Sequence, residues 1–365
     1  MSKASAGSYK PELDALRAVA ILIVMLHHYI PREIPFAGYG VMLFLALSGY
    51  FGTRSLLQMR DHVNAGGLTV RKSLKLFYGR RYWRILPVHI LVLVTTFIAN
   101  VPYARSEFGW NATFTSNWGM LIADDWFGRF SPLWSLAVLE QFYLLWPITV
   151  LLVPPRHFLK VVFGMIATAV VFRLVSLAFL AGPFVWTMVP LGALDQLGFG
   201  ALLALARHDV VRMPLLRGIR TVGSLVCGPV VFGVVIGRIF GYEPPYLSIW
   251  ISVVASLFFA WTIDRFLRGI GGPLGSFLRH PWLAAAGRAS YPAFLIHSFT
   301  ELLIPQISMI AWIFEHGLKF VILVPATFIL AHLATCYIEE PLGRFRKSRY
   351  SMPTGKVPAA QPLSG

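Results

Sequence analysis

The sequence is poor in charge and almost free of cysteine. Charged residues make up 13% of its 365 positions, against about 25% in an ordinary soluble domain. The two cysteines, Cys227 and Cys336, lie far apart in apolar segments, so they have no metal-ligand spacing, and we expect no metal site. Hydrophobic residues reach 56%. This balance excludes a soluble domain and predicts an integral membrane protein.

Successive apolar runs predict an all-α, polytopic bundle of about ten transmembrane helices. The predicted spans are residues 13–31, 37–56, 84–101, 133–153, 158–181, 186–206, 219–240, 246–264, 290–313 and 317–338. Leu68–Tyr78 is predicted to be a separate interfacial helix. We expect one membrane domain over residues 1–345 and a disordered cytoplasmic tail over 346–365.

Basic residues fall unevenly on the two sides of this predicted bundle. Alternate loops, both termini included, hold 26 of the 32 lysines and arginines, and the opposite loops hold five. The positive-inside rule then places both termini in the cytoplasm. We therefore expect a multi-pass protein of a bacterial inner membrane, in contact with lipid. The net charge of +16 needs no nucleic-acid partner.

The first predicted span carries Arg17 and, ten intervening residues later, His28. At ~1.5 Å per residue, the two lie about 16 Å apart along the helix axis. An arginine near the surface can extend to the headgroups, but a histidine deep in a bilayer is costly and usually functional. Either His28 is a catalytic group, or the pair His27-His28 already lies at the far interface.

A basic cluster, Arg80, Arg81 and Arg84, lies at the predicted cytoplasmic entrance of the third span. Arg81 and Arg84 are three residues apart and share one helix face. Paired guanidinium groups suit phosphate recognition because their donors are arranged as a planar fork. The alternative is ordinary anchoring of a span at the membrane surface.

Glu140 lies in the apolar fourth span and therefore needs a cation, a hydrogen-bond donor or its own proton. His28 approaches the same outward half, and a carboxylate that orients an imidazole suits general-base catalysis. In the ninth span, Ser290-Tyr291 is either a functional pair or a helix start. His297, two turns deeper, is harder to explain structurally.

Taken in order, these segments resemble the membrane acyltransferase 3 family. The resemblance covers residues 9–345 and rests on Arg17 with His28, Leu43–Tyr50, Arg80–Pro87, Trp134–Tyr143, Gly287–His297 and Glu339–Pro341. It implies ten transmembrane helices and the importance of Arg17, His28, Arg81 and Arg84. It also implies O-acyl transfer, commonly acetyl, from cytoplasmic acyl-coenzyme A to an extracytoplasmic or lipid-linked glycan. The arginine that the family carries two residues before the aspartate of the sixth span is here Ala193, ahead of Asp195.

These expectations combine into one mechanism. Residues of the donor site bind acyl-coenzyme A, and we assign to it Arg80, Arg81, Arg84, Ser290, Tyr291 and His297. His28 removes the proton of the acceptor hydroxyl, supported by Glu140 or Asp14. Arg17 stabilises developing negative charge or positions the donor.

Two alternatives to this function stay open. The acceptor is either a glycan, such as an exopolysaccharide unit, or a small hydrophobic molecule such as a macrolide. Trp110, Trp118 and Trp126 in an outward loop suit sugar stacking, but they also suit an aromatic belt. From another class, a transporter or flippase would explain the helices but not the arginine pair together with the histidine. The lack of an internal repeat argues against transporters built from matched halves.

Overall fold

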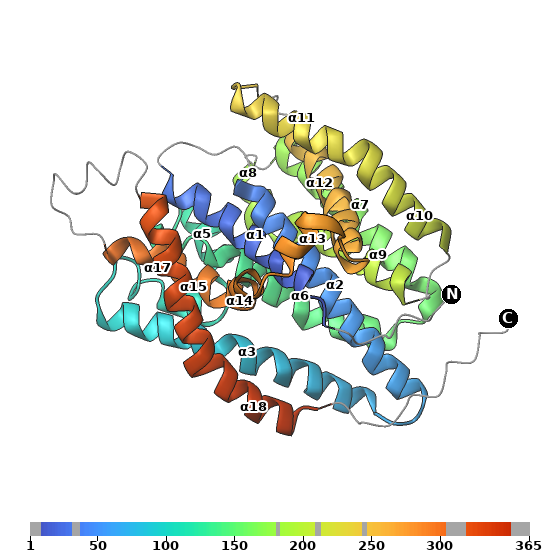
Figure 1. The fold of residues 1–365 in the computed structure, drawn as a ribbon, viewed down its shortest axis with the longest axis horizontal. Helices are drawn as coiled ribbons and strands as arrows, with labels where there is room; N and C mark the ends of the chain where they lie inside the picture. The colour runs from blue at the N-terminus through green and yellow to red at the C-terminus, as the bar shows by residue number, and fades with distance from the viewer. Residues whose placement is uncertain are drawn as a thin grey trace.

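The structure, a computed structural model, describes residues 9–30, 37–179, 183–208, 213–242, 247–303 and 319–351. Within these ranges the chain is helical and has no strand, so the all-α prediction is confirmed there. Figure 1 shows long helices packed into one bundle, with α3 and α17–α18 along one side and α10–α11 along the opposite side.

Seven helical segments of the described chain are long and apolar enough to cross a membrane. They are α2 (Ala37–Asn64), α3 (Val70–Ile98), α6 (Leu133–Leu152), α7 (Phe158–Phe179), α10 to α11 (Met213–Val222 and Gly228–Ile239), α12 (Leu247–Leu267), and α17 to α18 (Lys319–Ala334 and Glu340–Arg349). The chain is therefore a helical bundle of a kind that suits a multi-pass membrane protein.

Three further predicted spans correspond to helices outside that set of seven. These are α1 (Pro11–Tyr29), which carries three charged residues in its first two turns, α9 (Leu194–Arg207) and α15 (Ser290–Thr300). Residues 304–318, which include the second half of the predicted ninth span, lie outside the described residues. The count of ten and the side of the termini stay predictions. The short helices are α4 (Phe108–Ala112), α5 (Ser116–Ala123), α8 (Pro183–Met188), α13 (Gly272–Leu278) and α14 (Pro281–Arg288).

Helix α3 corrects the predicted third span. The prediction began this span at residue 84 and made Leu68–Tyr78 a separate helix, but α3 runs unbroken from Val70 to Ile98. The side chain of Thr69 caps its start by accepting a hydrogen bond from the amide of Lys72 at 3.2 Å. Arg81 therefore lies about 16 Å along the helix from its start rather than at the entrance of a span.

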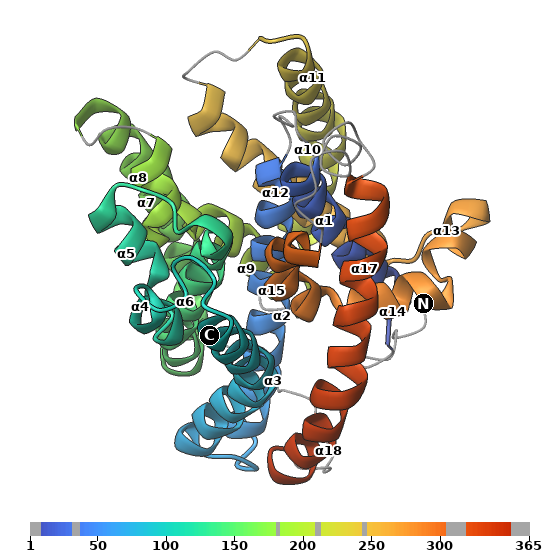
Figure 2. The same cartoon turned by 90° about the vertical axis from the view of Figure 1, so that its left-hand side faces the viewer.

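The C-terminal end also differs from the prediction. Helix α17 continues through the π-helical turn Thr335–Glu339 into α18, which ends at Arg349. The predicted domain boundary at residue 345 falls inside α18, so the first residues of the predicted disordered tail are helical. Figure 2 shows α18 beside α3. Residues 352–365 lie outside the described chain.

Helices α2 and α9 form the tightest crossing of the core. A Cβ at Gly49 would overlap the backbone of Leu197, and one at Gly200 would overlap the backbone of Ala46. Small residues at such a crossing let two backbones touch, which is how membrane helices gain packing energy without a hydrophobic effect between them. The crossing fixes α2, which lines the site described below.

A buried ion pair ties α7 to α9. Arg173 donates from Nη2 to Asp195 Oδ1 at 2.5 Å and to the carbonyl of Gly192 at 2.6 Å, and Ser252 donates to Asp195 Oδ2 at 3.0 Å. Arg173 is 2% exposed and Asp195 is fully buried. Asp195, which follows Ala193 by two residues, thus has its cationic partner on a neighbouring helix.

Candidate active site

One cavity, which we call the basic cavity, has a volume of about 630 Å³. Helices α1, α2, α3, α6, α15 and α18 contribute to its wall. Its cationic side chains are Arg17, Arg80, Arg81, Arg84, Arg346 and Lys347. Apolar side chains such as Val41, Phe44, Leu139 and Phe294 complete the lining. An apolar cavity with a few convergent polar groups is the usual form of a small-molecule site.

Within this cavity, Arg81 is paired with Glu140. Arg81 Nε and Nη2 donate to the two carboxylate oxygens at 2.8 and 2.6 Å. The guanidinium carbon lies 3.6 Å from the centre of the Tyr143 ring, whose hydroxyl donates to the carbonyl of Ser48 at 2.6 Å. The partner of Glu140 is thus Arg81 and not the predicted His28. The early start of α3 allows this contact because it places Arg81 at the depth of Glu140.

The second carboxylate predicted to support His28 is also occupied elsewhere. Asp14 Oδ1 accepts from Arg17 Nη1 at 2.7 Å, and the Arg17 guanidinium lies 4.5 Å from the centre of the Phe51 ring. Asp14 and His28 stand fourteen residues apart on α1, about 21 Å along the axis. The structure therefore brings neither carboxylate to His28, which corrects that part of the predicted mechanism.

Four cations of the basic cavity form no salt bridge with the described part of the chain: Arg80, Arg84, Arg346 and Lys347. Arg80 donates from Nε to the carbonyl of Tyr350 at 2.6 Å, and Arg346 donates to the carbonyl of Arg80 at 3.4 Å. The site is therefore built with an excess of positive charge around open space, which suits a polyanionic ligand.

Ser290 and Tyr291 line the same cavity, where the prediction placed them with the arginines. The Tyr291 hydroxyl donates to the carbonyl of Ile85 at 2.8 Å. This bond joins α15 to the turn of α3 that carries Arg84, so Tyr291 has a structural partner and its ring faces the cavity.

A second cavity, which we call the histidine cavity, has a volume of about 420 Å³. Its lining residues are Val24, His27, His28, Gly38, Val41, Trp126, Gly128, Ser131, Pro132 and Trp134. His28 is exposed and forms no hydrogen bond with the described residues. Val41 borders both cavities, so the two adjoin at this residue, with Arg17 on one side and His28 on the other.

His297 lies beside His28 and not among the arginines with which the prediction grouped it, which corrects its predicted place. It does not line the basic cavity, and its ring centre is 5.0 Å from that of His28. His297 Nδ1 lies 2.6 Å from the carbonyl of Phe294. A carbonyl can only accept, so Nδ1 carries a proton, and in the neutral ring Nε2 accepts from the hydroxyl of Ser298 at 3.2 Å.

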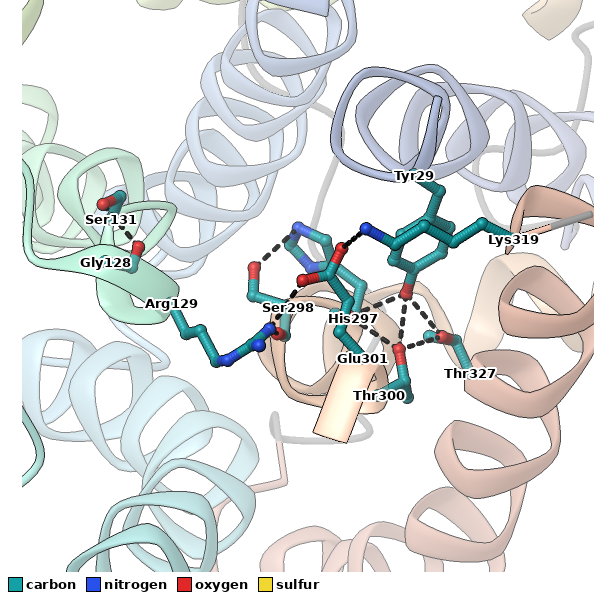
Figure 3. A network of polar contacts seen from close by, with 10 residues as sticks. All are labelled: Tyr29, Gly128, Arg129, Ser131, His297, Ser298, Thr300, Glu301, Lys319 and Thr327. Atoms are coloured by element: carbon teal, nitrogen blue, oxygen red, sulfur yellow. Dashed lines mark hydrogen bonds and ion pairs between the residues drawn. The ribbon is translucent and has the colours of Figure 1, made fainter. Parts of the chain in front are cut away.

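A hydroxyl network fixes the end of α1 next to His28 (Figure 3). Tyr29 is only 1% exposed. Its hydroxyl lies 2.7 Å from the carbonyl of His297, 2.7 Å from Thr300 Oγ1 and 2.8 Å from Thr327 Oγ1. It therefore joins α1 to both α15 and α17. Tyr29 was not among the predicted site residues, although its position next to His28 in the sequence was a signal that could have found it.

An ionic bridge holds the wall of the histidine cavity in place. Glu301 accepts from Arg129 Nη1 at 2.6 Å and pairs with Lys319 Nζ at 2.5 Å. Arg129 lies in the 3-10 turn between Gly128 and Ser131, two residues that line the cavity. The bridge thus ties this wall to the end of α15 and the start of α17.

No group of three histidine, cysteine or acidic side chains that could hold a metal ion occurs in the part of the chain that the structure describes. Within that part, Cys227 is buried and Cys336 is half-buried, and both are free thiols.

A bundle with a cationic cavity that adjoins a histidine cavity is consistent with a membrane-bound group-transfer protein. Residues 10–338 match the acyltransferase domain of the acyltransferase 3 family. The chain belongs to this family, as its motifs predicted, and is thereby an acyltransferase.

Particular relatives narrow the comparison. The chain is 32% identical over 176 residues to the peptidoglycan O-acetyltransferase OatA of Listeria monocytogenes, a match that covers 43% of this chain and 27% of that protein. It is 34% identical over 153 residues to the putative peptidoglycan O-acetyltransferase YrhL of Bacillus subtilis, covering 38% and 23%. A putative O-acetyltransferase of Staphylococcus aureus is 33% identical over 153 residues, covering 38% and 24%. The matched segment thus spans about a quarter of each relative. No solved structure matches the chain.

Proposed function

We propose that the protein is a membrane O-acyltransferase that moves an acetyl group from acyl-coenzyme A in the basic cavity to a glycan hydroxyl in the histidine cavity. The observation that carries this proposal is that one residue, Val41, lines both cavities. One cavity has the charge for the donor, and the other presents the imidazole of His28, which forms no hydrogen bond with the described residues. The names of the relatives support acetyl transfer to a glycan.

The donor fits the basic cavity by charge and by polarity. Coenzyme A carries a diphosphate and a 3′-phosphate, and phosphate oxygens form strong, charge-assisted hydrogen bonds with guanidinium groups. Arg80 and Arg84 line the cavity and form no salt bridge with the described residues, so their guanidinium groups are available to such oxygens. The inner wall of Val41, Phe44 and Phe294 then takes the uncharged pantetheine arm and its thioester.

His28 performs the chemistry at the other end. Its imidazole takes the proton of the acceptor hydroxyl while the hydroxyl oxygen attacks the thioester carbonyl. The carbon–sulfur bond breaks, the coenzyme leaves as a thiolate, and that thiolate recovers the proton from the imidazolium. Arg17 lines the basic cavity, so of its two predicted roles, positioning the donor is the one that the geometry favours.

The acceptor site has the features of a sugar site. Trp126 and Trp134 line the histidine cavity, and their faces can stack on sugar rings. Of the other two loop tryptophans, Trp118 donates from its indole to Gln141 at 3.0 Å, and Trp110 packs against Gly119. A saccharide unit, free or lipid-linked, is therefore favoured over a macrolide.

The test is a transfer assay with the purified protein in lipid nanodiscs. Labelled acetyl-coenzyme A and a lipid-linked or peptidoglycan saccharide should yield an acetylated saccharide, and Trp126→Ala should raise the KM for the saccharide alone. If the wild-type protein neither binds nor consumes acetyl-coenzyme A, the proposed acyltransferase reaction is contradicted and a transport function is favoured. Acylation of a macrolide in preference to any saccharide would reassign the acceptor.

A further inference from the structure

Helix α18 is held firmly against the arginine-bearing face of α3. The rings of Phe345 and Trp83 meet edge to face at 5.2 Å between their centres. The Tyr350 ring fills the space above Gly79, where any Cβ would overlap it. The carbonyl of Tyr350 accepts from Arg80 at 2.6 Å. The last described turn of the chain is thus a fixed wall of the basic cavity.

This wall contributes two cations that form no salt bridge with the described part of the chain, although Glu339 attracts Arg346 electrostatically. Arg346 and Lys347 both line the basic cavity. Arg346 has only the carbonyl of Arg80 as an acceptor, at 3.4 Å, and Lys347 has no hydrogen bond or salt bridge with the described residues. Arg346 is half-buried and Lys347 is exposed, so both keep hydrogen-bond donors available to an anion that enters the cavity.

Their place in the cavity assigns them an anion. The apolar inner wall, near Val41 and Phe294, lies toward the histidine cavity, whereas α18 closes the opposite end of the basic cavity together with Arg80. A donor whose thioester points toward His28 therefore has its diphosphate near Arg84 and Arg80. Its outermost group, the nucleotide, lies against α18.

We infer that Arg346 and Lys347 bind the 3′-phosphate of the acyl-coenzyme A nucleotide. This inference rests on the proposed function, because it requires acyl-coenzyme A to occupy the basic cavity. It makes α18 the element that distinguishes acyl-coenzyme A from acyl thioesters that lack this phosphate.

The experiment compares acetyl-coenzyme A with acetyl-dephospho-coenzyme A, which lacks only the 3′-phosphate. Binding of both ligands is measured by calorimetry on the full-length protein in nanodiscs. The wild type should prefer acetyl-coenzyme A by about tenfold or more, the factor expected for a charge-assisted hydrogen bond. Arg346→Ala and Lys347→Ala should each remove most of this preference and leave the affinity for the dephospho ligand unchanged. Arg346→Gln keeps the length of the side chain and should behave in the same way.

Two control variants test whether the effect is specific to Arg346 and Lys347. Arg349→Ala changes a cation of α18 that does not line the cavity, so it should preserve the preference. Arg84→Ala should lower the affinity for both ligands by the same factor, because Arg84 faces the diphosphate that the two ligands share.

Three outcomes would overturn the inference. The first is an equal loss of affinity for both ligands in the Arg346 and Lys347 variants, which would mean that α18 only supports the cavity. The second is a wild type that binds both ligands equally well. The third is a preference that disappears in nanodiscs with anionic lipid, which would assign the two cations to a lipid headgroup. In each of these cases the wild type still binds acetyl-coenzyme A, so the proposed function survives. Failure of the wild type to bind either ligand would reject both.

Discussion

The pairing of Arg81 with Glu140 predicts a strong energetic coupling between two helices. Replacing either residue leaves its partner buried, since the side chains are only 17% and 9% exposed. Removing one member of a buried pair typically costs about 3–5 kcal/mol. Because Arg81 is partly exposed, we expect Arg81→Ala and Glu140→Ala each to lower the free energy of unfolding by about 3 kcal/mol, the lower end of this range. The double variant should cost little more than either single one, so the coupling energy should also be about 3 kcal/mol.

The assay is a double-mutant cycle on the free energy of unfolding, measured by SDS titration in mixed micelles. Arg84→Ala serves as the comparison, because Arg84 has no salt bridge in the described chain. It should change stability by no more than about 0.5 kcal/mol while lowering the affinity for acetyl-coenzyme A about tenfold or more.

The result that would refute this reasoning is additivity. If the costs of Arg81→Ala and Glu140→Ala add to within about 0.5 kcal/mol in the double variant, the two side chains do not stabilise each other. Arg81 would then be a phosphate ligand like Arg84, and Glu140 would be available to another group.

Three further predictions concern the histidine cavity and the sides of the membrane. His28→Ala should abolish acyl transfer in a protein that inserts and purifies normally, whereas His27→Ala should reduce it mildly, because the two side chains lie ~100° apart on α1; normal transfer by His28→Ala would remove His28 from the mechanism. Tyr29→Phe should lower kcat and leave the KM for the donor unchanged, and steady-state kinetics check this. The same variant should destabilise the protein by about 1–3 kcal/mol in an SDS titration, because buried hydrogen-bonding groups lose their partner. An unchanged kcat would limit the role of Tyr29 to stability. In sealed vesicles of known orientation, acetyl-coenzyme A should support transfer only from the cytoplasmic face, with product on the opposite face or in its leaflet; transfer with both substrates confined to the cytoplasmic side would reject a site that opens to both faces.

The sequence predicted the helical class, the family and the residue clusters, because each depends on local composition or on an ordered set of motifs. It missed how the clusters pair, because pairing depends on depth. Six cations between Arg71 and Arg84 lower the hydropathy of the first half of α3. A hydropathy criterion therefore begins the span too late and leaves Arg81 at the surface, away from Glu140. In the structure, that half packs against α2 and α18, and tertiary contacts replace the missing apolarity.

His297 shows a second limit of the same kind. It lies seven residues after Ser290, which is two helical turns or about 10 Å along α15. Ser290 therefore lines the basic cavity while His297 contacts His28 beyond it. The spacing was readable in the sequence, but the boundary at Val41 between the two cavities was not, because Val41 belongs to another helix.

The glycine crossing of α2 and α9 holds one wall of the basic cavity in place independently of the side chains on the opposite wall. Backbone touches backbone at Gly49 and Gly200, so neither position accepts a side chain, and the α2 wall beside Ser48 keeps its shape whatever else changes. The facing wall consists of side chains on α3 and α18, whose exchange leaves that crossing untouched. A replacement on α3 or α18 should thus reshape one wall of the basic cavity and leave the α2 wall in place.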